Sequence, residues 1–447
     1  MKTAPDTEDA HPGRRMPGRR ARSIRWFLAL FLLTLSGPIL AEDSSEAEKQ
    51  PQAQKDANEF RFLLRKPPSL RFGKLFRIDF RAKFQGVFRG FSPPVTTDEG
   101  LFEFRRKRVS IEGTFLKHFE YEVESELRRE DHWKDVNLNF RYFRNFQIKA
   151  GKFKLPFGME QTTGTMSLDF AYRSLLSDNL TPSRDRGIMA HGRFWERGLN
   201  YEGGIFVRDG DNSLSKRSTG AERTFAGRVS GTPLRLVAAP DYLRAMEFGL
   251  AMTSGTVPEG LKGLRGQTIV TSEAFFPEFY VHGQRRRLGL QWDWSPGPFS
   301  LKSEWVQYND QRRGQSIRGT DLCDLISRGW YAAGTWVITG ESKAGGVEPK
   351  KPFLEKGGLG AVELAARFEV LRFGSSEHIG LASRSPRAAN ILENSNRAWT
   401  VGINWYLNRW VKIQTNGIRE KLEDPQRSPI PGKTLFYTWL CHLQFVM

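Results

Sequence analysis

Alternation of apolar and polar residues with a period of two is the feature that most constrains this chain. From Phe76 to Phe88 every second residue is apolar or small, and the positions between them, from Arg77 to Arg89, are mainly charged or polar. A period of two is typical of a β-strand with one apolar and one polar face, and it excludes an amphipathic helix. At about 3.3 Å per residue, the segment is long enough to cross a bilayer when tilted.

The same alternation recurs along the rest of the chain and gives about sixteen expected strands. After the first, these are 109–115, 119–127, 136–142, 146–150, 188–194, 199–207, 225–231, 245–252, 288–294, 299–305, 330–338, 362–370, 399–405, 411–415 and 435–445. The mean hydropathy of -0.51 does not exclude a membrane, because each strand of a transmembrane barrel alternates lipid-facing and lumen-facing residues. The alternative is an all-β sandwich whose core takes up the aromatic residues.

Connection lengths favour the barrel. Transmembrane barrels keep their periplasmic turns short and their external loops long. The expected periplasmic turns are 116–118, 143–145, 195–198, 295–298 and 407–409, and the long external loops are 153–186, 253–284 and 371–397. Two expected inner turns, 232–243 and 339–359, are longer than this rule prefers. We therefore expect an all-β, transmembrane, antiparallel up-and-down β-barrel of about 16 strands over residues 71–447.

The N-terminus has the form of a secretory signal. Six arginines lie between Arg14 and Arg25, an apolar run follows over residues 26–35, and small residues lead to Ala41. We expect a signal peptide at 1–41, with an uncleaved anchor as the alternative. Residues 42–70 show neither alternation nor an apolar stripe, and predict a flexible periplasmic extension. Export and a barrel together predict the outer membrane of a Gram-negative-type envelope.

Positive charge suggests what the barrel passes. The chain has a formal charge of +18, and the alternation points many basic side chains at the lumen. Arginine presents a fork that matches two phosphate oxygens, lysine a mobile point charge, and rings of such residues select anions. Pairing Phe115 with Phe119 would set Arg108 opposite Glu126, so wall pairing is the competing interpretation. The lumenal candidates from alternation are Arg81, Lys83, Arg106, Arg108, Arg141, Arg285 and Arg287.

Several ordered motifs resemble the phosphate-selective porin O and P family. They are Phe104-Arg105-Arg106-Lys107-Arg108, Gly151-Lys152-Phe153-Lys154-Leu155-Pro156-Phe157-Gly158, Arg184-Asp185-Arg186-Gly187, Gly329-Trp330-Tyr331 with Thr339-Gly340-Glu341, and Gly402-Ile403-Asn404-Trp405-Tyr406-Leu407-Asn408. The resemblance implies a sixteen-stranded barrel, usually trimeric, with the third external loop folded into the pore. Loop 153–186 is the third external loop, so Lys152, Lys154, Arg184 and Arg186 would flank the constriction. Only its place in the first motif recommends Arg105, which alternates out of phase.

We therefore expect an anion-selective porin that passes phosphate or polyphosphate by passive diffusion. A general or organic-anion porin and a plugged structural barrel are the alternatives. The seven histidines are scattered without metal-ligand spacing, so no catalytic site, metal or cofactor is expected. The expected partners are phosphate or other small anions, outer-membrane lipid and lipopolysaccharide, and further copies of the chain in a homotrimer. Nucleic acid is not expected.

Overall fold

The computed structural model describes most of the chain beyond residue 59. The described residues are 60–63, 67–73, 75–95, 102–127, 132–195, 198–210, 222–237, 239–355, 357–375, 383 and 391–447. The expected signal peptide 1–41 and residues 42–59 of the expected extension lie outside them.

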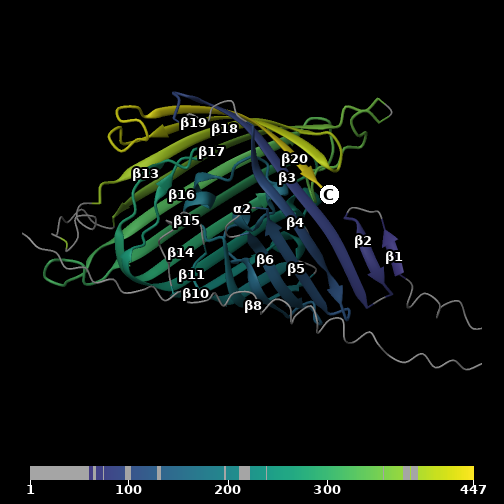
Figure 1. Ribbon diagram of the computed structural model, residues 1–447, viewed down its shortest axis with the longest axis horizontal. Coiled ribbons are helices and arrows are strands. Elements are labelled where there is room, and N and C mark those ends of the chain that lie inside the picture. Colours follow the sequence, from purple (N-terminus) through teal and green to yellow (C-terminus); the bar gives the residue numbers. More distant parts are fainter. Residues whose placement is uncertain are drawn as a thin grey trace, which may run out of the picture. The chain divides into compact units, whose positions relative to one another are not determined.

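Sixteen antiparallel strands form a closed barrel, as the alternation predicts (Figure 1). The ring closes where β20 pairs with β3, from Tyr437 opposite Ser92 to Val446 opposite Lys83. The strands are β3 (Phe76–Ser92), β4 (Glu103–Phe115), β5 (Phe119–Glu126), β6 (Trp133–Phe140), β7 (Gln147–Lys154), β8 (Arg184–Phe194), β9 (Leu199–Phe206), β10 (Glu222–Gly231), β11 (Met246–Leu261), β14 (Tyr280–Trp294), β15 (Phe299–Arg312), β16 (Leu322–Val337), β17 (Ala361–Ser375), β18 (Asn394–Tyr406), β19 (Val411–Leu422) and β20 (Leu435–Val446).

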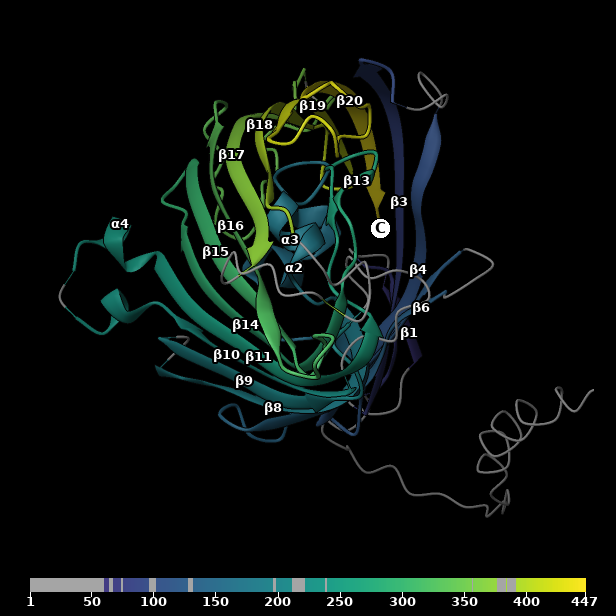
Figure 2. The same cartoon turned by 90° about the vertical axis from the view of Figure 1, so that its left-hand side faces the viewer.

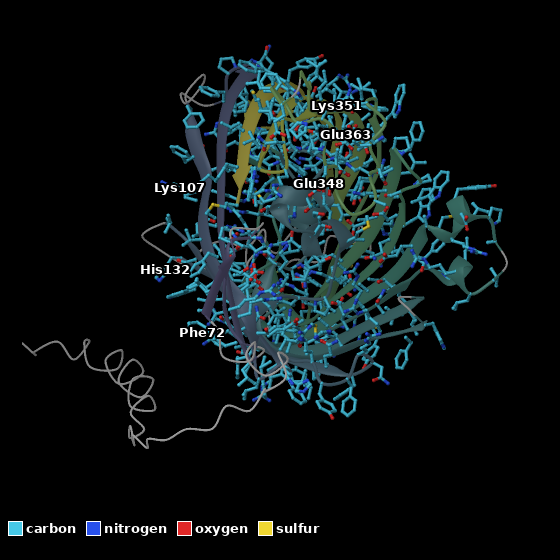
Figure 3. All side chains as sticks on the ribbon, turned by 90° about the vertical axis from the view of Figure 1, so that its right-hand side faces the viewer. Phe72, Lys107, His132, Glu348, Lys351 and Glu363 are labelled. Atoms are coloured by element: carbon cyan, nitrogen blue, oxygen red, sulfur yellow. The ribbon has the colours of Figure 1, made fainter. Side chains whose placement is uncertain are left out.

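The pleat of these strands separates an apolar outer face from a polar interior. In β16 the side chain of Trp330 is 40% exposed, whereas that of Tyr331 is 2% exposed. Figure 3 shows nitrogen- and oxygen-bearing side chains crowded within the ring of strands. In the hairpin of β4 and β5, the Phe115 and Phe119 rings stack with centroids 4.9 Å apart, which confirms the predicted pairing.

The connections reproduce the expected rhythm of short turns and long loops. At one end of the barrel lie the short turns 116–118, 141–146, 295–298 and 407–410, and at the other the long connections 155–183 and 262–279. Only four residues separate β8 from β9 in the chain, whereas 18 separate β17 from β18. The two longer inner turns contain no strand among their described residues. Residues 232–245 carry η4 (Pro233–Arg235) and α4 (Asp241–Arg244), and residues 338–360 form the second. We call the short-turn end periplasmic.

The last part of the expected flexible extension is a hairpin instead. Strands β1 (Phe60–Leu63) and β2 (Ser69–Phe72) pair with each other, and β2 pairs with β3 from Ser69 opposite Asp79 to Phe72 opposite Phe76. Because β20 pairs with β3 only as far as Lys83, the start of β3 has a free edge. Strand β2 covers the hydrogen-bonding groups that this edge would leave unpaired.

The third external loop, residues 155–183, folds into the barrel as the family resemblance implies. Figure 2 shows α2 (Met159–Thr162) and α3 (Leu175–Asn179) within the ring of strands, and η2 (Thr165–Ser167) lies between them in the chain. The loop's apolar side chains join the largest buried cluster, in which Phe157, Leu176 and Leu180 are fully buried. A short pair, β12 (Gly266–Gln267) and β13 (Ala274–Phe276), lies in connection 262–279. None of the helices among the described residues is long and apolar enough to cross a membrane.

Candidate functional site: a basic constriction beside the third loop

Carboxylates on the barrel wall hold the start of each helix in the third loop. The Glu304 carboxylate on β15 accepts hydrogen bonds from the backbone N–H groups of Met159 and Glu160, the latter at 2.9 Å. The Glu369 carboxylate on β17 accepts from the N–H of Leu175 at 2.5 Å. The first N–H groups of a helix have no partner within the helix, so wall carboxylates satisfy them. The loop is therefore fixed against one side of the lumen.

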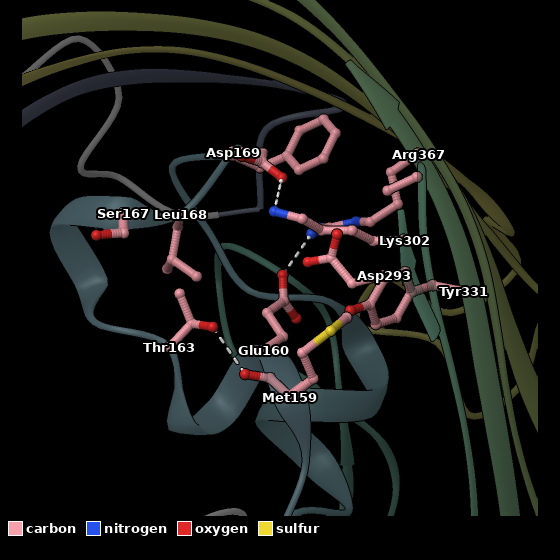
Figure 4. A pocket seen from close by; sticks show the side chains of 12 residues that line it. Met159, Glu160, Thr163, Ser167, Leu168, Asp169, Asp293, Lys302, Tyr331 and Arg367 are labelled. Carbon is pink, nitrogen blue, oxygen red and sulfur yellow. Dashed lines mark hydrogen bonds and ion pairs between the residues drawn. The ribbon is translucent and has the colours of Figure 1, made fainter. Parts of the chain in front are cut away.

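Asp169 ties the middle of the same loop to two lysines. Its carboxylate lies 2.8 Å from the Lys302 ammonium (Figure 4) and 2.7 Å from that of Lys343. Burial alone would raise the pKa of Asp169, but these two ammonium groups hold it well below its ordinary value. Glu160 pairs with Arg367 at 3.1 Å beside them, around a cavity of about 40 Å³. The loop is therefore closely packed against this part of the wall, and its other side faces β3 and β4.

On that other side, a β-bulge turns Arg105 toward the loop. The register between β3 and β4 shifts between Gln85 and Gly86, which leaves Arg105 as an extra residue in β4. A bulge re-aims side chains that strict alternation would point outward. The Arg105 Nη1 donates to the Ala171 carbonyl oxygen at 2.5 Å, and its guanidinium carbon lies 3.5 Å from the centre of the Tyr172 ring. Arg105 therefore bridges the wall and the third loop.

Arg106 lies next to this bridge and has no carboxylate partner. Its Nη1 donates to the Gln85 side-chain oxygen at 2.6 Å, and among the described residues it makes no ion pair. Arg105 and Arg173 lie near enough to act electrostatically on Arg106, as does Asp178 of α3. Burial raises the pKa of Asp178, although the neighbouring arginines oppose that rise. The charges that act on Arg106 are thus three further guanidinium groups, since Arg108 also contributes, and the one carboxyl of Asp178.

Lys154, at the end of β7, is a second cation without a carboxylate partner. Its Nζ donates to the carbonyl oxygens of Thr162 at 3.2 Å and Thr163 at 2.8 Å, and no ion pair is found for it in the described part of the chain. Arg173 uses its guanidinium in the same way, since it donates to the Thr163 carbonyl at 2.9 Å. Beside Lys154 lies a cavity of about 310 Å³, bounded by the third loop and by strands β3 to β9.

Other predicted residues face the lumen or, in the case of Arg141, lie at its periplasmic mouth, but each has a carboxylate partner. Arg108 lies opposite Glu126, as the hairpin register predicts, with 2.5 Å between Nε and the carboxylate. Such pairs stabilise the wall and leave less charge for a solute. The remaining pairs are Lys83 with Glu124, Arg108 with Glu124 at 3.1 Å, Arg184 with Asp135 at 2.6 Å, Arg81 with Glu112 at 3.1 Å and Arg141 with Glu120 at 2.9 Å.

The structure corrects the prediction that Lys152 and Arg186 flank the constriction from inside. The two residues are cross-strand partners, and Lys152 also pairs with Val136, whose side chain is exposed on the outer face. Arg186 shares the face of Ile188, which is 62% exposed. The Lys152 Nζ donates outside the lumen to the Trp133 carbonyl at 2.9 Å. Strict alternation would place Lys154 on the same face as Lys152, but Lys154 is the last residue of β7, and its side chain reaches the third loop inside the barrel.

Arg285 and Arg287 also differ from the prediction, because they are structural rather than pore-lining. They are 1% and 4% exposed. Arg285 pairs with Asp310 at 2.7 Å, and both arginines pair with Asp209, at 2.7 and 3.1 Å. Burial would raise the pKa of Asp209, but the two arginines lower it to about 2. They fix an external loop to the wall and do not reach the passage.

Sequence reasoning missed Arg173, Lys302 and Lys343. Arg173 lies within the loop that was expected to enter the pore, so it could have been predicted as a pore residue from its position in the sequence. Lys343 lies in a periplasmic turn, and nothing in the local sequence indicates that it reaches Asp169. Among the described residues no cluster of three or more histidine, cysteine or acidic side chains is placed to hold a metal ion.

Comparison with known proteins identifies the family to which this barrel belongs. Residues 76–432 match the family model described as phosphate-selective porin O and P. Porin O of Pseudomonas aeruginosa is 22% identical over 355 residues, which cover 72% of this chain and 76% of that protein. Two solved structures share the fold at a TM-score of 0.50. They are the anion-selective porin from Comamonas acidovorans (10% identity, 83% of this chain and 99% of that one) and the channel DcaP of Acinetobacter baumannii (8% identity, 83% and 97%). The chain therefore belongs to the phosphate-selective porin O and P family and is a β-barrel porin of the outer membrane.

Proposed function

We propose that this porin is anion-selective and conducts phosphate by passive diffusion past Arg106 and Lys154. The observation that carries the proposal is that these two cations have no carboxylate partner among the described residues, at the level where the third loop narrows the lumen. A pore selects ions where unneutralised charge meets the solute at close range. The third loop, anchored at Glu304, Glu369 and Asp169, brings the solute there.

The cavity below the constriction supports this location. The side chains that line it include five cations, Lys83, Arg108, Lys149, Lys154 and Arg184, and four carboxylates, Glu122, Glu124, Asp135 and Glu202. Without Lys154 the two signs are equal in number, so the rest of this part of the lumen has little preference of its own. Arg106 and Arg173 add positive charge on its external side, which makes the constriction the selective step.

The chemistry of the donors favours phosphate. Arg106 has five N–H donors and uses one of them on Gln85, and Lys154 has three and donates to two carbonyl oxygens. The remaining donors can replace part of the hydration that an oxyanion gives up. Arg106 and Lys154 can also release the ion, because neither side chain is held by an ion pair among the described residues. Phosphate can accept two parallel hydrogen bonds from the guanidinium fork with two of its oxygens. Chloride is a single atom and cannot form this bidentate pair.

The relatives add support of a second kind. The family description names phosphate selectivity, and the similar porin of Comamonas acidovorans is anion-selective. We propose in addition that the chain acts as a homotrimer, and crosslinking in native membranes tests that part. We propose no catalytic activity and no cofactor.

The test is chloride current through the purified porin in a planar bilayer while phosphate, pyrophosphate or a dicarboxylate is added. Phosphate should block chloride current at lower concentration than the dicarboxylate, because its oxygens surround a single atom and can meet the guanidinium fork and the ammonium group within one small ion. Pyrophosphate blocking more strongly than phosphate would favour polyphosphate as the solute. Equal block by all three anions would make the protein a general anion porin. A barrel that carries no current would be plugged, and the proposal would be wrong.

A further inference from the structure

Six basic side chains form a row on the outer surface of the barrel near its external end. All six are exposed and lie on the face that carries the lipid-facing apolar residues. We call this set the outer basic row. It consists of Arg286 on β14, Arg328 on β16, Arg372 on β17, Arg397 on β18, and Arg419 and Lys421 on β19.

Like charges face each other directly across strands in this row. Arg328 is the cross-strand partner of Arg372, and Arg397 is the partner of Lys421. Like charges in directly opposite positions destabilise a sheet. Among the residues that the structure describes, none of the six forms an ion pair. The protein therefore keeps an electrostatic cost on its outer surface that only an external anion would relieve.

Nearby carboxylates on the same face do not supply that anion. Asp324 accepts a hydrogen bond from the Asn309 side chain at 2.9 Å, and Glu423 accepts one from the Ser395 hydroxyl at 2.5 Å. Within the row itself, Arg328 donates only to the neutral side chain of Gln307, at 3.1 Å. The positive charge stays open toward the surroundings of the barrel.

The row lies along the membrane boundary. Barrel strands are tilted, so a line of constant height crosses the ladder diagonally. The row follows such a diagonal. Arg372 pairs with Ser395, two residues before Arg397, so the row shifts by two residues from β17 to β18. Toward the periplasm lie the Trp330, Phe368 and Trp399 rings, whose successive centroids are 5.5 and 4.7 Å apart. Aromatic residues occupy the interface of outer-membrane barrels, and the basic row therefore lies at headgroup level.

We propose that the outer basic row binds the phosphate groups of a phosphorylated glycolipid in the outer leaflet, as in the lipid A part of lipopolysaccharide. Opposed residues of a strand pair have Cα atoms about 4.5–5.5 Å apart, so one phosphate can accept from both members of a like-charge pair. Arg328 with Arg372 would hold one phosphate, and Arg397 with Lys421 a second. The acyl chains would lie on the Trp330, Phe368 and Trp399 rings.

Binding of defined lipids to the delipidated porin in detergent, followed by native mass spectrometry, tests this site. The probes are bisphosphorylated lipid A, its monophosphorylated form and a fully dephosphorylated form. For the intact chain, affinity should fall at each removal of a phosphate. The variant pairs are Arg328→Gln with Arg372→Gln, and Arg397→Gln with Lys421→Gln. Each charge removed near an anionic surface weakens binding roughly fivefold, so each pair should weaken bisphosphorylated lipid A about 30-fold.

The matched control removes two exposed positive charges from the periplasmic end, in Arg144→Gln with Arg235→Gln, and should leave lipid binding unchanged. Conductance and phosphate block should stay the same in every variant, since these side chains point away from the lumen. Equal affinity for the three lipids would overturn the proposal even if the variants fail to assemble. The proposal would also be overturned if the variants became monomeric but still bound lipid. The outer basic row would then be a contact between copies of the chain.

Discussion

Replacing Arg106 with glutamine removes a charge from the constriction without breaking an ion pair. Glutamine keeps a polar side chain beside Gln85, so the wall should stay intact and the free energy of unfolding should change little. A hydrogen bond to a charged group is worth about 1.5–3 kcal/mol. That range corresponds to phosphate block weakened about 10- to 150-fold. Arg106 is only half-buried, so we expect a value near tenfold.

The assay is phosphate titration of the single-channel chloride current, with Lys152→Gln as the control. Both substitutions remove one positive charge from a strand of the same barrel, β4 for Arg106 and β7 for Lys152, but the Lys152 side chain lies on the outer face. Lys152→Gln should leave both the block and the reversal potential unchanged. The reasoning is refuted if Arg106→Gln shifts the blocking concentration by less than about twofold. It is equally refuted if Lys152→Gln weakens the block as much as Arg106→Gln does.

Three further predictions concern the third loop and its neighbours. Lys154→Gln should lower phosphate block several-fold, and a block equal to that of the intact chain would remove Lys154 from the passage. Because burial raises the pKa of Asp178, this carboxyl loses its charge at higher pH than an ordinary aspartate, so anion selectivity should rise as the pH falls through the range just above that in which an ordinary aspartate titrates. Asp178→Asn should be more selective at neutral pH and insensitive to pH over that range, and a persisting pH dependence would contradict this assignment. Asp169→Asn leaves Lys302 without its buried partner, a loss of about 3–5 kcal/mol, and should increase open-channel noise and tryptic cleavage within 155–183. The pKa of Asp169 is lowered, so its anchor is complete above about pH 4 and is lost only as the pH falls further, and noise unchanged in that acid range would count against it.

The barrel could be predicted well from the sequence, because successive residues of a strand point to opposite faces and therefore alternate between apolar and polar. The turn 116–118 is short enough to determine the register of its hairpin, and Arg108 accordingly lies opposite Glu126. The third loop was located by its length and by the family resemblance. These features are determined by residues that are close together in the chain, so they can be predicted from the sequence.

The selective residues were harder to predict because they depend on contacts distant in sequence. Arg105 turns inward only because of a bulge against β3, and alternation alone assigns it to the outer face. Arg285 and Arg287 alternate toward the lumen as predicted, yet Asp209 from a distant loop neutralises them. Lumenal orientation is thus visible in the sequence, whereas freedom from ion pairing is visible only in the structure.

The central claim is that unneutralised cations at the third loop make this porin prefer anions. The most direct measurement is the reversal potential of the purified, intact porin in a planar bilayer under a KCl gradient. We predict a potential whose sign shows chloride passing more readily than potassium, and one that moves toward zero in Arg106→Gln. A potential that favours potassium, or one that the substitution leaves unchanged, would contradict the claim.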